Sequence, residues 1–224
     1  MKCTNQTFPA NAGLTERRSV LLDCGANVGQ SLTAFAQGTT PSLDRIIFDG
    51  WDVFSFEPNP KLHHRIEKVM DGLAAEYERT SFELVPAGCW WEDGELTFFE
   101  GIATHQAGTF ASWRRKRAEP CNRWPTGSGP VVKSDGPSLP VIDFPAWVKA
   151  HLTKDDLILM KVDIEGAEYK LIEAMEAAGV MDWIDIFYVE WSTQSLTPPV
   201  SRRDVNILIR RLEATYGLQV RKWL

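Results

Sequence analysis

Two short apolar runs that each end in a carboxylate constrain this chain most. Ser19–Cys24 carries Asp23 and leads at once into the turn Gly25–Gly29, and Val53–Glu57 ends in Glu57. Parallel strands end at a common edge where ligands bind, and the turn after the first strand meets the ligand with its backbone. An acidic group at the end of the next strand is well placed to accept hydrogen bonds from ribose hydroxyls. The pair therefore predicts a nucleoside-binding site.

Apolar runs alternate with helical stretches along the chain, and this alternation is typical of parallel βαβ units. We expect strands at Ser19–Cys24, Val53–Glu57, Phe82–Val85, Glu95–Glu100 (after a hairpin-type turn at Asp93-Gly94), Leu139–Ile142, Leu157–Val162, Ile184–Val189 and within Gly217–Leu224. We expect helices at Gly29–Gln37, Lys61–Leu73, Pro145–His151, Glu168–Ala178 and Arg202–Thr215. The sequence predicts one α/β domain over 1–224, with a core at 18–100 and 139–216 around an irregular insertion at 101–138.

Composition excludes several classes of protein. The hydrophobic fraction of 44% and charged fraction of 24% are ordinary for a globular domain. A net charge of −6 argues against a protein that wraps nucleic acid across a broad face. No apolar run approaches the ~20 residues that span a bilayer, and the amino-terminal stretch shows no secretory signal. The four cysteines lack zinc-ligand spacing, so we expect free thiols in a cytoplasmic protein.

The first turn, Asp23–Gly29, points to a ligand rather than to a dinucleotide. Gly25 and Gly29 permit positive φ or close contact with a ligand, and the helix that follows favours an anionic group at its amino end. A plain strand-to-helix turn capped by Asn27 or Ser31 is the alternative. Asn27 stands where a dinucleotide fingerprint has its second glycine, and no later glycine completes that motif, which disfavours a dehydrogenase.

The order of motifs resembles a known family. DCGANVGQS, FSFEPNP, PAGCWWEDGELTFFEG, VIDF and LILMKVDIEGAEYKLIEA, between Ser19 and Trp191, are similar to motifs of the FkbM-like S-adenosylmethionine-dependent methyltransferases. The resemblance implies a Rossmann-like class I methyltransferase fold, a mostly parallel sheet with helices on both faces. It also implies S-adenosyl-L-methionine as cofactor. A seven-stranded sheet of this kind needs a closing hairpin, and only Gly217–Leu224 remains for it.

The resemblance also implies which residues hold the cofactor. The turn would hold the methionine part, Glu57 the ribose, and the end of the third strand would border the adenine. Pro86 departs from the family there, where a polar residue is frequent. The expected cofactor-binding residues are Asp23, Gly25, Ala26, Asn27, Gly29, Ser31, Glu57, Pro58, Ala87 and Gly88.

Methyl transfer to a hydroxyl requires that the hydroxyl lose its proton, so a base or a metal is expected. Asp163 and Glu165 end the run LILMKVD and are two residues apart, which in an extended strand places both on one side. They would act as base and orienter, or as ligands of Mg²⁺. Alternatively, Glu165 stabilises the start of the next helix. Glu190 follows IDIFYVE and either completes a three-carboxylate set or is a solvated strand end.

The insertion and the tryptophans supply further candidates. His105 is either a general base or an ordinary polar loop residue. Trp113–Arg117, WRRKR, either clamps the phosphate of a nucleotide-sugar or is a solvated charge run. Trp90 and Trp91 are placed to stack on a base or a sugar ring, whereas Trp147 is expected in the core.

These features together predict an O-methyltransferase that acts on a hydroxyl of a sugar, glycan or other small molecule. A sugar is the preferred acceptor because the resembled family includes enzymes that methylate sugars and polyketide-type hydroxyls. One alternative is an RNA or protein methyltransferase, which the Trp113–Arg117 cluster favours. The other is a non-catalytic S-adenosylmethionine-binding module, and the acids at the strand ends speak against it.

Overall fold

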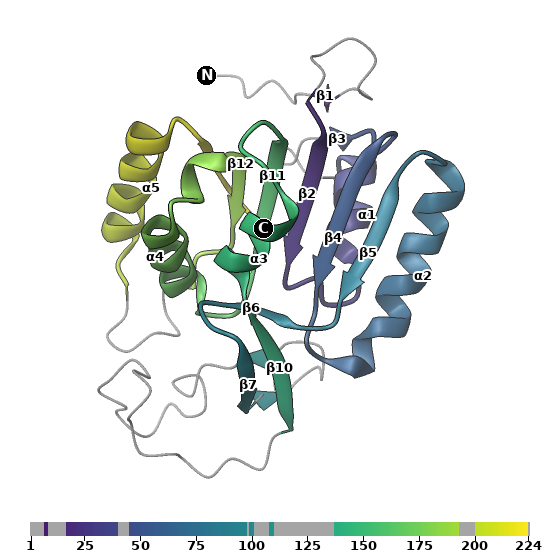
Figure 1. Cartoon of the computed structure of the whole chain (residues 1–224), viewed down its shortest axis with the longest axis horizontal. Helices are drawn as coiled ribbons and strands as arrows, with labels where there is room; N and C mark the ends of the chain where they lie inside the picture. Colours follow the sequence, from purple (N-terminus) through teal and green to yellow (C-terminus); the bar gives the residue numbers. More distant parts are fainter. Residues whose placement is uncertain are drawn as a thin grey trace.

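Six parallel strands form the centre of the protein (Figure 1). The computed structural model describes residues 7–8, 17–39, 45–97, 99–100, 108–109, 137–192 and 200–223. In spatial order the strands are β13 (Gln219–Lys222), β12 (Ile184–Val189), β11 (Leu157–Val162), β2 (Ser19–Cys24), β4 (Trp51–Phe56) and β5 (Ser81–Val85). Every neighbouring pair is parallel, so all six carboxyl ends lie at one edge of the sheet. A mostly parallel α/β sheet was predicted, and it is confirmed.

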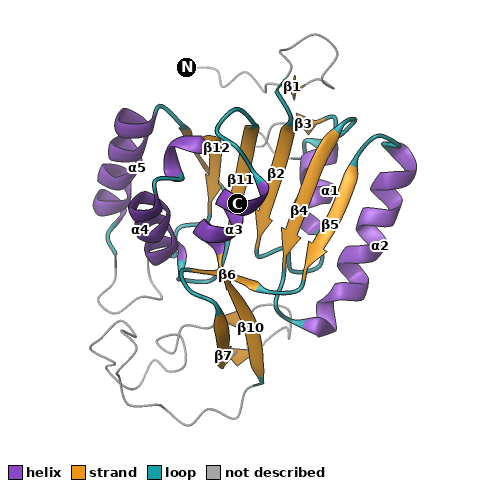
Figure 2. Cartoon of the chain, in the orientation of Figure 1, coloured by secondary structure: helices purple, strands orange, loops and turns teal. Residues whose placement is uncertain are grey.

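Helices cover both faces of this sheet (Figure 2). Because successive side chains of a strand point to opposite faces, neighbouring residues of β2 divide between two cores. Leu21 packs with α1 (Gln30–Gln37) and α2 (Pro60–Glu76). Leu22 packs with the helices of the other face, which are α3 (Phe144–His151), α4 (Glu168–Ala178) and α5 (Arg202–Tyr216). Within the described ranges, no helix is both long enough and apolar enough to cross a membrane.

A second, smaller sheet lies beyond the carboxyl ends of the central strands (Figure 1). Its order is β6 (Gly88–Trp90), β10 (Ser138–Asp143) and β7 (Gly94–Thr97), with β10 parallel to β6 and antiparallel to β7. The prediction of a hairpin at Asp93-Gly94 is therefore wrong, because β10 lies between the two strands that this turn connects. Two short pairs complete the strands: β1 (Thr7–Phe8) with β3 (Arg45–Ile46), and β8 (Phe99–Glu100) with β9 (Gly108–Thr109).

Local signals place the element ends close to where the sequence predicts them. Gly38, Gly179 and Gly217 end α1, α4 and α5 in the left-handed conformation. The short helix η2 (Met181–Trp183) separates α4 from β12. The last strand, β13, runs parallel to β12 instead of closing the sheet as part of a hairpin. The sheet thus ends with six strands in the described part of the chain.

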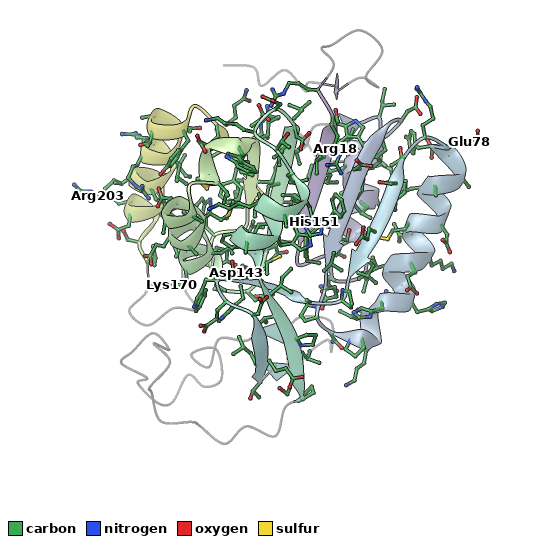
Figure 3. All side chains as sticks on the ribbon, in the orientation of Figure 1. Arg18, Glu78, Asp143, His151, Lys170 and Arg203 are labelled. Atoms are coloured by element: carbon green, nitrogen blue, oxygen red, sulfur yellow. The ribbon has the colours of Figure 1, made fainter. Side chains whose placement is uncertain are left out.

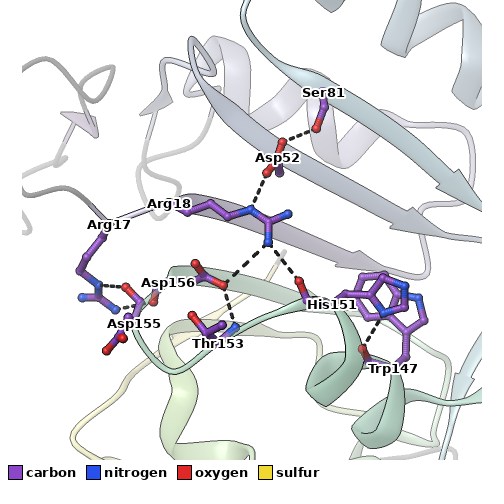
Figure 4. Close-up of polar contacts among 9 residues, drawn as sticks. All are labelled: Arg17, Arg18, Asp52, Ser81, Trp147, His151, Thr153, Asp155 and Asp156. Carbon is purple, nitrogen blue, oxygen red and sulfur yellow. Dashed lines mark hydrogen bonds and ion pairs between the residues drawn. The ribbon is translucent and has the colours of Figure 1, made fainter.

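Two arginines join the amino ends of the strands (Figure 4). Arg18 Nε donates to Asp52 Oδ2 over 2.6 Å, and its Nη1 donates to the carbonyl of His151 over 3.0 Å. Arg17 donates to the carbonyl of Asp155 and pairs with Asp185. In Figure 3, Arg18 lies in the upper part of the central sheet, whereas Asp143, the N-cap of α3, lies lower, near the small sheet. These arginines therefore stabilise the sheet at the end away from the small sheet.

The turn after β2 packs backbone to backbone against the end of β11. Gly25 has φ +82°, and a Cβ there would lie 2.0 Å from the carbonyl oxygen of Asp163. The amide of Asp163 donates to the carbonyl of Cys24 over 3.1 Å, and the amide of Gly25 donates to the carbonyl of Phe56 over 3.1 Å. Only glycine satisfies both the dihedral angle and the space at position 25.

We predict that Gly25→Ala destabilises the fold more than Gly50→Ala does. Gly50 has φ +81°, and no atom lies within 4 Å of the place that a Cβ would take, so alanine there incurs only the left-handed penalty of about 1–2 kcal/mol. Gly25→Ala adds a backbone clash and should lower the free energy of unfolding by roughly 3 kcal/mol or more. Chemical denaturation of both variants measures the difference, and equal losses would contradict the contact.

Candidate functional site

A row of polar side chains crosses the central sheet near its carboxyl edge. In the strand register Asp23 of β2 lies between Lys161 of β11 and Ser55 of β4. All three side chains are buried. Asp23 accepts a hydrogen bond from Ser31 of α1 and pairs with Lys161, whose Nζ lies 3.4 Å from Asp23 Oδ1. The expected cofactor residues Asp23 and Ser31 thus contact each other, and both are buried.

Lys161 is a site residue that sequence reasoning missed. Its ammonium group donates to the carbonyl of Gly25 over 2.7 Å and lies 3.7 Å from Asp163 Oδ2. Burial lowers the pKa of Lys161, but the carboxylates of Asp23 and Asp163 raise it above its ordinary value. The signal that would have found it is a lysine within the apolar run LILMKV. A buried lysine in a central strand requires anionic partners.

Glu57 is held by two backbone amides at the next strand end. Its Oε2 accepts from the amide of Asn27 over 2.9 Å, and its Oε1 accepts from the amide of Asn59 over 2.9 Å. Burial raises the pKa of Glu57 to about 7, although both hydrogen bonds oppose that shift. Each carboxylate oxygen keeps a second lone pair for a further donor. The geometry orients Glu57 and leaves it able to accept hydroxyl hydrogen bonds.

The other expected cofactor residues gather around this carboxylate. Ala26 donates its amide to the carbonyl of Phe56 over 3.0 Å, and the amide of Glu57 donates to the carbonyl of Val85, which brings the end of β5 alongside. Ala87 and Gly88 follow there and are buried, as is Pro58 beside Glu57. Gly29 has φ +79° and begins α1 against Val69 of α2. The turn, the end of β4 and the end of β5 thus meet at one edge.

Asn27 carries an unsatisfied polar atom in this group. It adopts φ +53°, a left-handed conformation that asparagine tolerates better than most residues. Its Oδ1 is buried and has no hydrogen-bond partner. A buried acceptor without a donor costs about 1–3 kcal/mol, so the atom is ready for a donor from a ligand.

Asp163 and Glu190 form a carboxyl pair at the ends of adjacent strands. Asp163 follows β11 and Glu190 follows β12, and the amide of Glu190 donates to the carbonyl of Val162 over 2.9 Å. Burial raises the pKa of Glu190 to about 7, and its hydrogen bond with the Asp163 side chain adds to that shift. Near neutral pH, Glu190 therefore exchanges a proton. Such a pair can take up and release a proton at the site.

Glu165 does not follow the geometry that the sequence predicts. The chain leaves the extended conformation after β11, with φ +59° at Glu165 and +111° at Gly166. The inference that Asp163 and Glu165 share a side because they lie in an extended strand is therefore wrong. The alternative role at the helix start belongs to Glu168, in the first turn of α4.

Glu168 organises the loop between Asp163 and α4. Its Oε1 accepts from the amides of Ile164 and Gly166, over 3.2 and 2.9 Å, and from the hydroxyl of Ser192. The side chain is fully buried, and burial raises its pKa to about 7. Sequence reasoning missed this role, although an acid in the first turn of a helix is the signal for it.

The remaining candidates are placed as follows. No three His, Cys, Asp or Glu side chains gather as metal ligands in the described ranges, so Asp163, Glu165 and Glu190 do not form such a set there. Trp90 stacks on Trp91 with ring centroids 3.9 Å apart, so these rings pack on each other. His105 and Trp113–Arg117 lie outside the residues that the structure describes.

Comparison with known families agrees with this arrangement. The methyltransferase FkbM domain matches residues 23–198, which run from Asp23 past Glu190. The chain belongs to the FkbM methyltransferase family. The family implies S-adenosylmethionine as cofactor, and the six-stranded parallel sheet is consistent with the Rossmann-like methyltransferase fold. Searches of curated proteins and of solved structures gave no significant match.

The residues present fit this cofactor. Glu57 offers free lone pairs to the ribose hydroxyls, and Asn27 Oδ1 offers an unsatisfied acceptor. The left-handed turn at Gly25 carries no side chain, because the carbonyl of Asp163 occupies the place of a Cβ. An FkbM methyltransferase can therefore hold its cofactor with the turn and Glu57 as they stand.

We predict that the thermal stability of the ligand-free protein falls as pH rises from 5 to 8. Glu57, Glu168 and Glu190 have pKa values of about 7 in the folded protein, whereas unfolded glutamates titrate near 4.5. Between these values the folded state binds more protons, so stability is greatest at the acidic side and is lost as pH rises. Calorimetric melting should show a drop of at least ~3 °C.

Glu168→Gln is the matched control for this pH dependence, since it removes one titrating group and keeps an acceptor oxygen. The melting temperature of this variant should depend less steeply on pH than that of the natural chain. A melting temperature that rises across this range would contradict the buried carboxyls.

Proposed function

We propose that the protein transfers the methyl group of S-adenosylmethionine to a hydroxyl oxygen of a sugar, a glycan or another small molecule. The observation that carries the proposal is the Asp163–Glu190 pair beside the cofactor turn. Asp163 donates its amide to the last residue of β2, and its carbonyl contacts Gly25. Asp163, the proposed proton acceptor, is therefore in backbone contact with the turn proposed to bind the cofactor. A methyltransferase that acts on a hydroxyl needs its base close to its cofactor.

The cofactor half of the proposal rests on Glu57 and the turn. Glu57 accepts hydrogen bonds from the ribose hydroxyls. The Gly25–Gly29 turn and the amino end of α1 bind the methionine part. The buried segment at Ala87 and Gly88 borders the adenine. When bound, the cofactor supplies a methyl group that is already activated by its sulfonium. The protein must therefore align the acceptor and exclude water.

The acceptor half rests on Asp163. Its carboxylate accepts the proton of the acceptor hydroxyl as the hydroxyl oxygen takes the methyl group, and the proton then passes to Glu190 or to solvent. Glu190, whose carboxyl is hydrogen-bonded to Asp163, is the partner that we propose in place of Glu165. His105 stays a candidate from the sequence.

We also propose a reducing compartment such as the cytoplasm. The described cysteines, Cys24 and Cys89, are free and buried. Burial holds the pKa of the Cys89 thiol well above its ordinary value, so this thiol stays protonated. Free thiols of this kind are usual in proteins of reducing compartments.

Glu57→Gln should weaken cofactor binding at least 10-fold. The glutamine side chain has one acceptor oxygen and one NH₂ group, so it cannot accept hydrogen bonds from the backbone amides of both Asn27 and Asn59 in the present geometry. It also loses the negative charge that strengthens hydrogen bonds from the ribose hydroxyls. Titration calorimetry with S-adenosylhomocysteine measures the affinity. Glu67→Gln, an exposed change on α2, is the control and should leave the affinity unchanged. Absence of saturable binding by the natural chain would refute the cofactor half.

Asp163→Asn should lower turnover at least ~100-fold while leaving cofactor affinity within about 3-fold. Formation of S-adenosylhomocysteine is measured with a panel of sugars and nucleotide-sugars, which also identifies the acceptor class. Glu190→Gln should reduce turnover less and flatten the pH dependence near 7. If Asp163→Asn retains turnover, Asp163 has a structural role only.

A further inference from the structure

The ammonium group of Lys161 contacts both the turn at Gly25 and the carboxylate of Asp163. We propose that Lys161 is a positioning residue of the transfer site, whose ammonium group holds the cofactor turn at Gly25 and the carboxylate of Asp163 in fixed relation. The inference rests on the function proposed above and deepens it. Lys161 belongs to β11 and is fully buried, so it acts through these two neighbours rather than by touching a substrate.

Lys161, Gly25 and Asp163 each contact the other two. Lys161 Nζ donates to the carbonyl of Gly25 over 2.7 Å and lies 3.7 Å from Asp163 Oδ2. Gly25 cannot move toward β11, because the carbonyl of Asp163 already occupies the space where its Cβ would stand. The ammonium group therefore holds the carbonyl of Gly25, while the Asp163 backbone packs against the Cα of Gly25. A shift of either partner breaks a contact of the other.

Replacement of the whole Asp23–Lys161 pair is expected to leave the fold intact. Lys161 shares its face of β11 with Leu159, and its ammonium group lies 5.4 Å from the ring centroid of Trp223. A buried ion pair in such a place can often be replaced by apolar residues of similar volume at no loss of stability. The charge is better explained by the site, where two strand ends must keep their relative positions.

The charge also acts on the carboxyls at both ends of the site. It lowers the pKa of Glu57 on the cofactor side and of Glu190 on the acceptor side, in both cases against burial. The titratable groups that surround Lys161 and this carboxyl pair are Asp23, Cys24, Glu57, Cys89, Asp163, Glu168, Tyr188, Glu190 and Arg221. Loss of the ammonium group should therefore make Glu190 harder to ionise.

The test compares Asp23→Asn/Lys161→Met with Asp23→Asn alone. The double variant removes both members of the buried pair, so no unpaired carboxylate is left at Asp23, and methionine keeps the length of the lysine stem. The Glu190 carboxyl is followed by carbon-13 NMR, with its signal assigned through Glu190→Gln. Affinity for S-adenosylhomocysteine is measured by calorimetry. Lys161→Arg tests rescue by a retained charge.

We expect the double variant to fold, to titrate Glu190 at a higher pH than Asp23→Asn does, and to bind S-adenosylhomocysteine at least 10-fold more weakly. Lys161→Arg should keep the Glu190 titration near that of the natural chain. Equal titration of Glu190, or equal affinity for S-adenosylhomocysteine, in the double and single variants would overturn the proposal. A double variant that does not fold, while Asp23→Asn folds, would assign Lys161 to the fold and also overturn it.

The two proposals fail in different ways. If the natural chain shows no saturable cofactor binding, the proposed function fails, whereas the NMR titration needs neither cofactor nor acceptor. If the natural chain binds and the variants bind equally well, only the role of Lys161 fails.

Discussion

Strand β2 hydrogen-bonds along its length to β4 on one side and to β11 on the other, and the site depends on this double pairing. It brings Asp23 level with Lys161 and places the turn at Gly25 against the end of β11. The amides of Gly25 and Ala26 then share the carbonyl of Phe56 at the end of β4. The proposed cofactor residue Glu57 and the proposed proton acceptor Asp163 thereby follow the ends of two strands that both pair with β2.

Much of the fold could be predicted because its signals are local. The strand at Leu157–Val162 and the helix at Glu168–Ala178 have the predicted bounds, since a mostly apolar run marks the strand and a terminal glycine marks the end of the helix. The carboxylate at Glu57 was predicted as a ligand-binding acid, and the structure orients it with two backbone amides. Periodicity and turn residues were sufficient for these features.

The errors concern geometry that a linear pattern does not contain. The left-handed conformation at Glu165 ends the extended chain, so an argument from alternation stops at Val162. Lys161 was overlooked because a single charge in an apolar run gains its meaning only from Asp23, a residue on a different strand. A local backbone conformation decides the first case and pairing between strands the second, and periodicity along one strand carries no information about either.

The small sheet has a consequence for how this enzyme family can diversify. Ser138, at the start of β10, pairs with Thr97, at the end of β7, so the chain leaves and re-enters at neighbouring points. The entropic cost of closing such an excursion rises by only about 0.6 kcal/mol for each doubling of its length. Residues 98–137 can therefore lengthen, shorten or change composition with little effect on the sheet that carries Glu57 and Asp163.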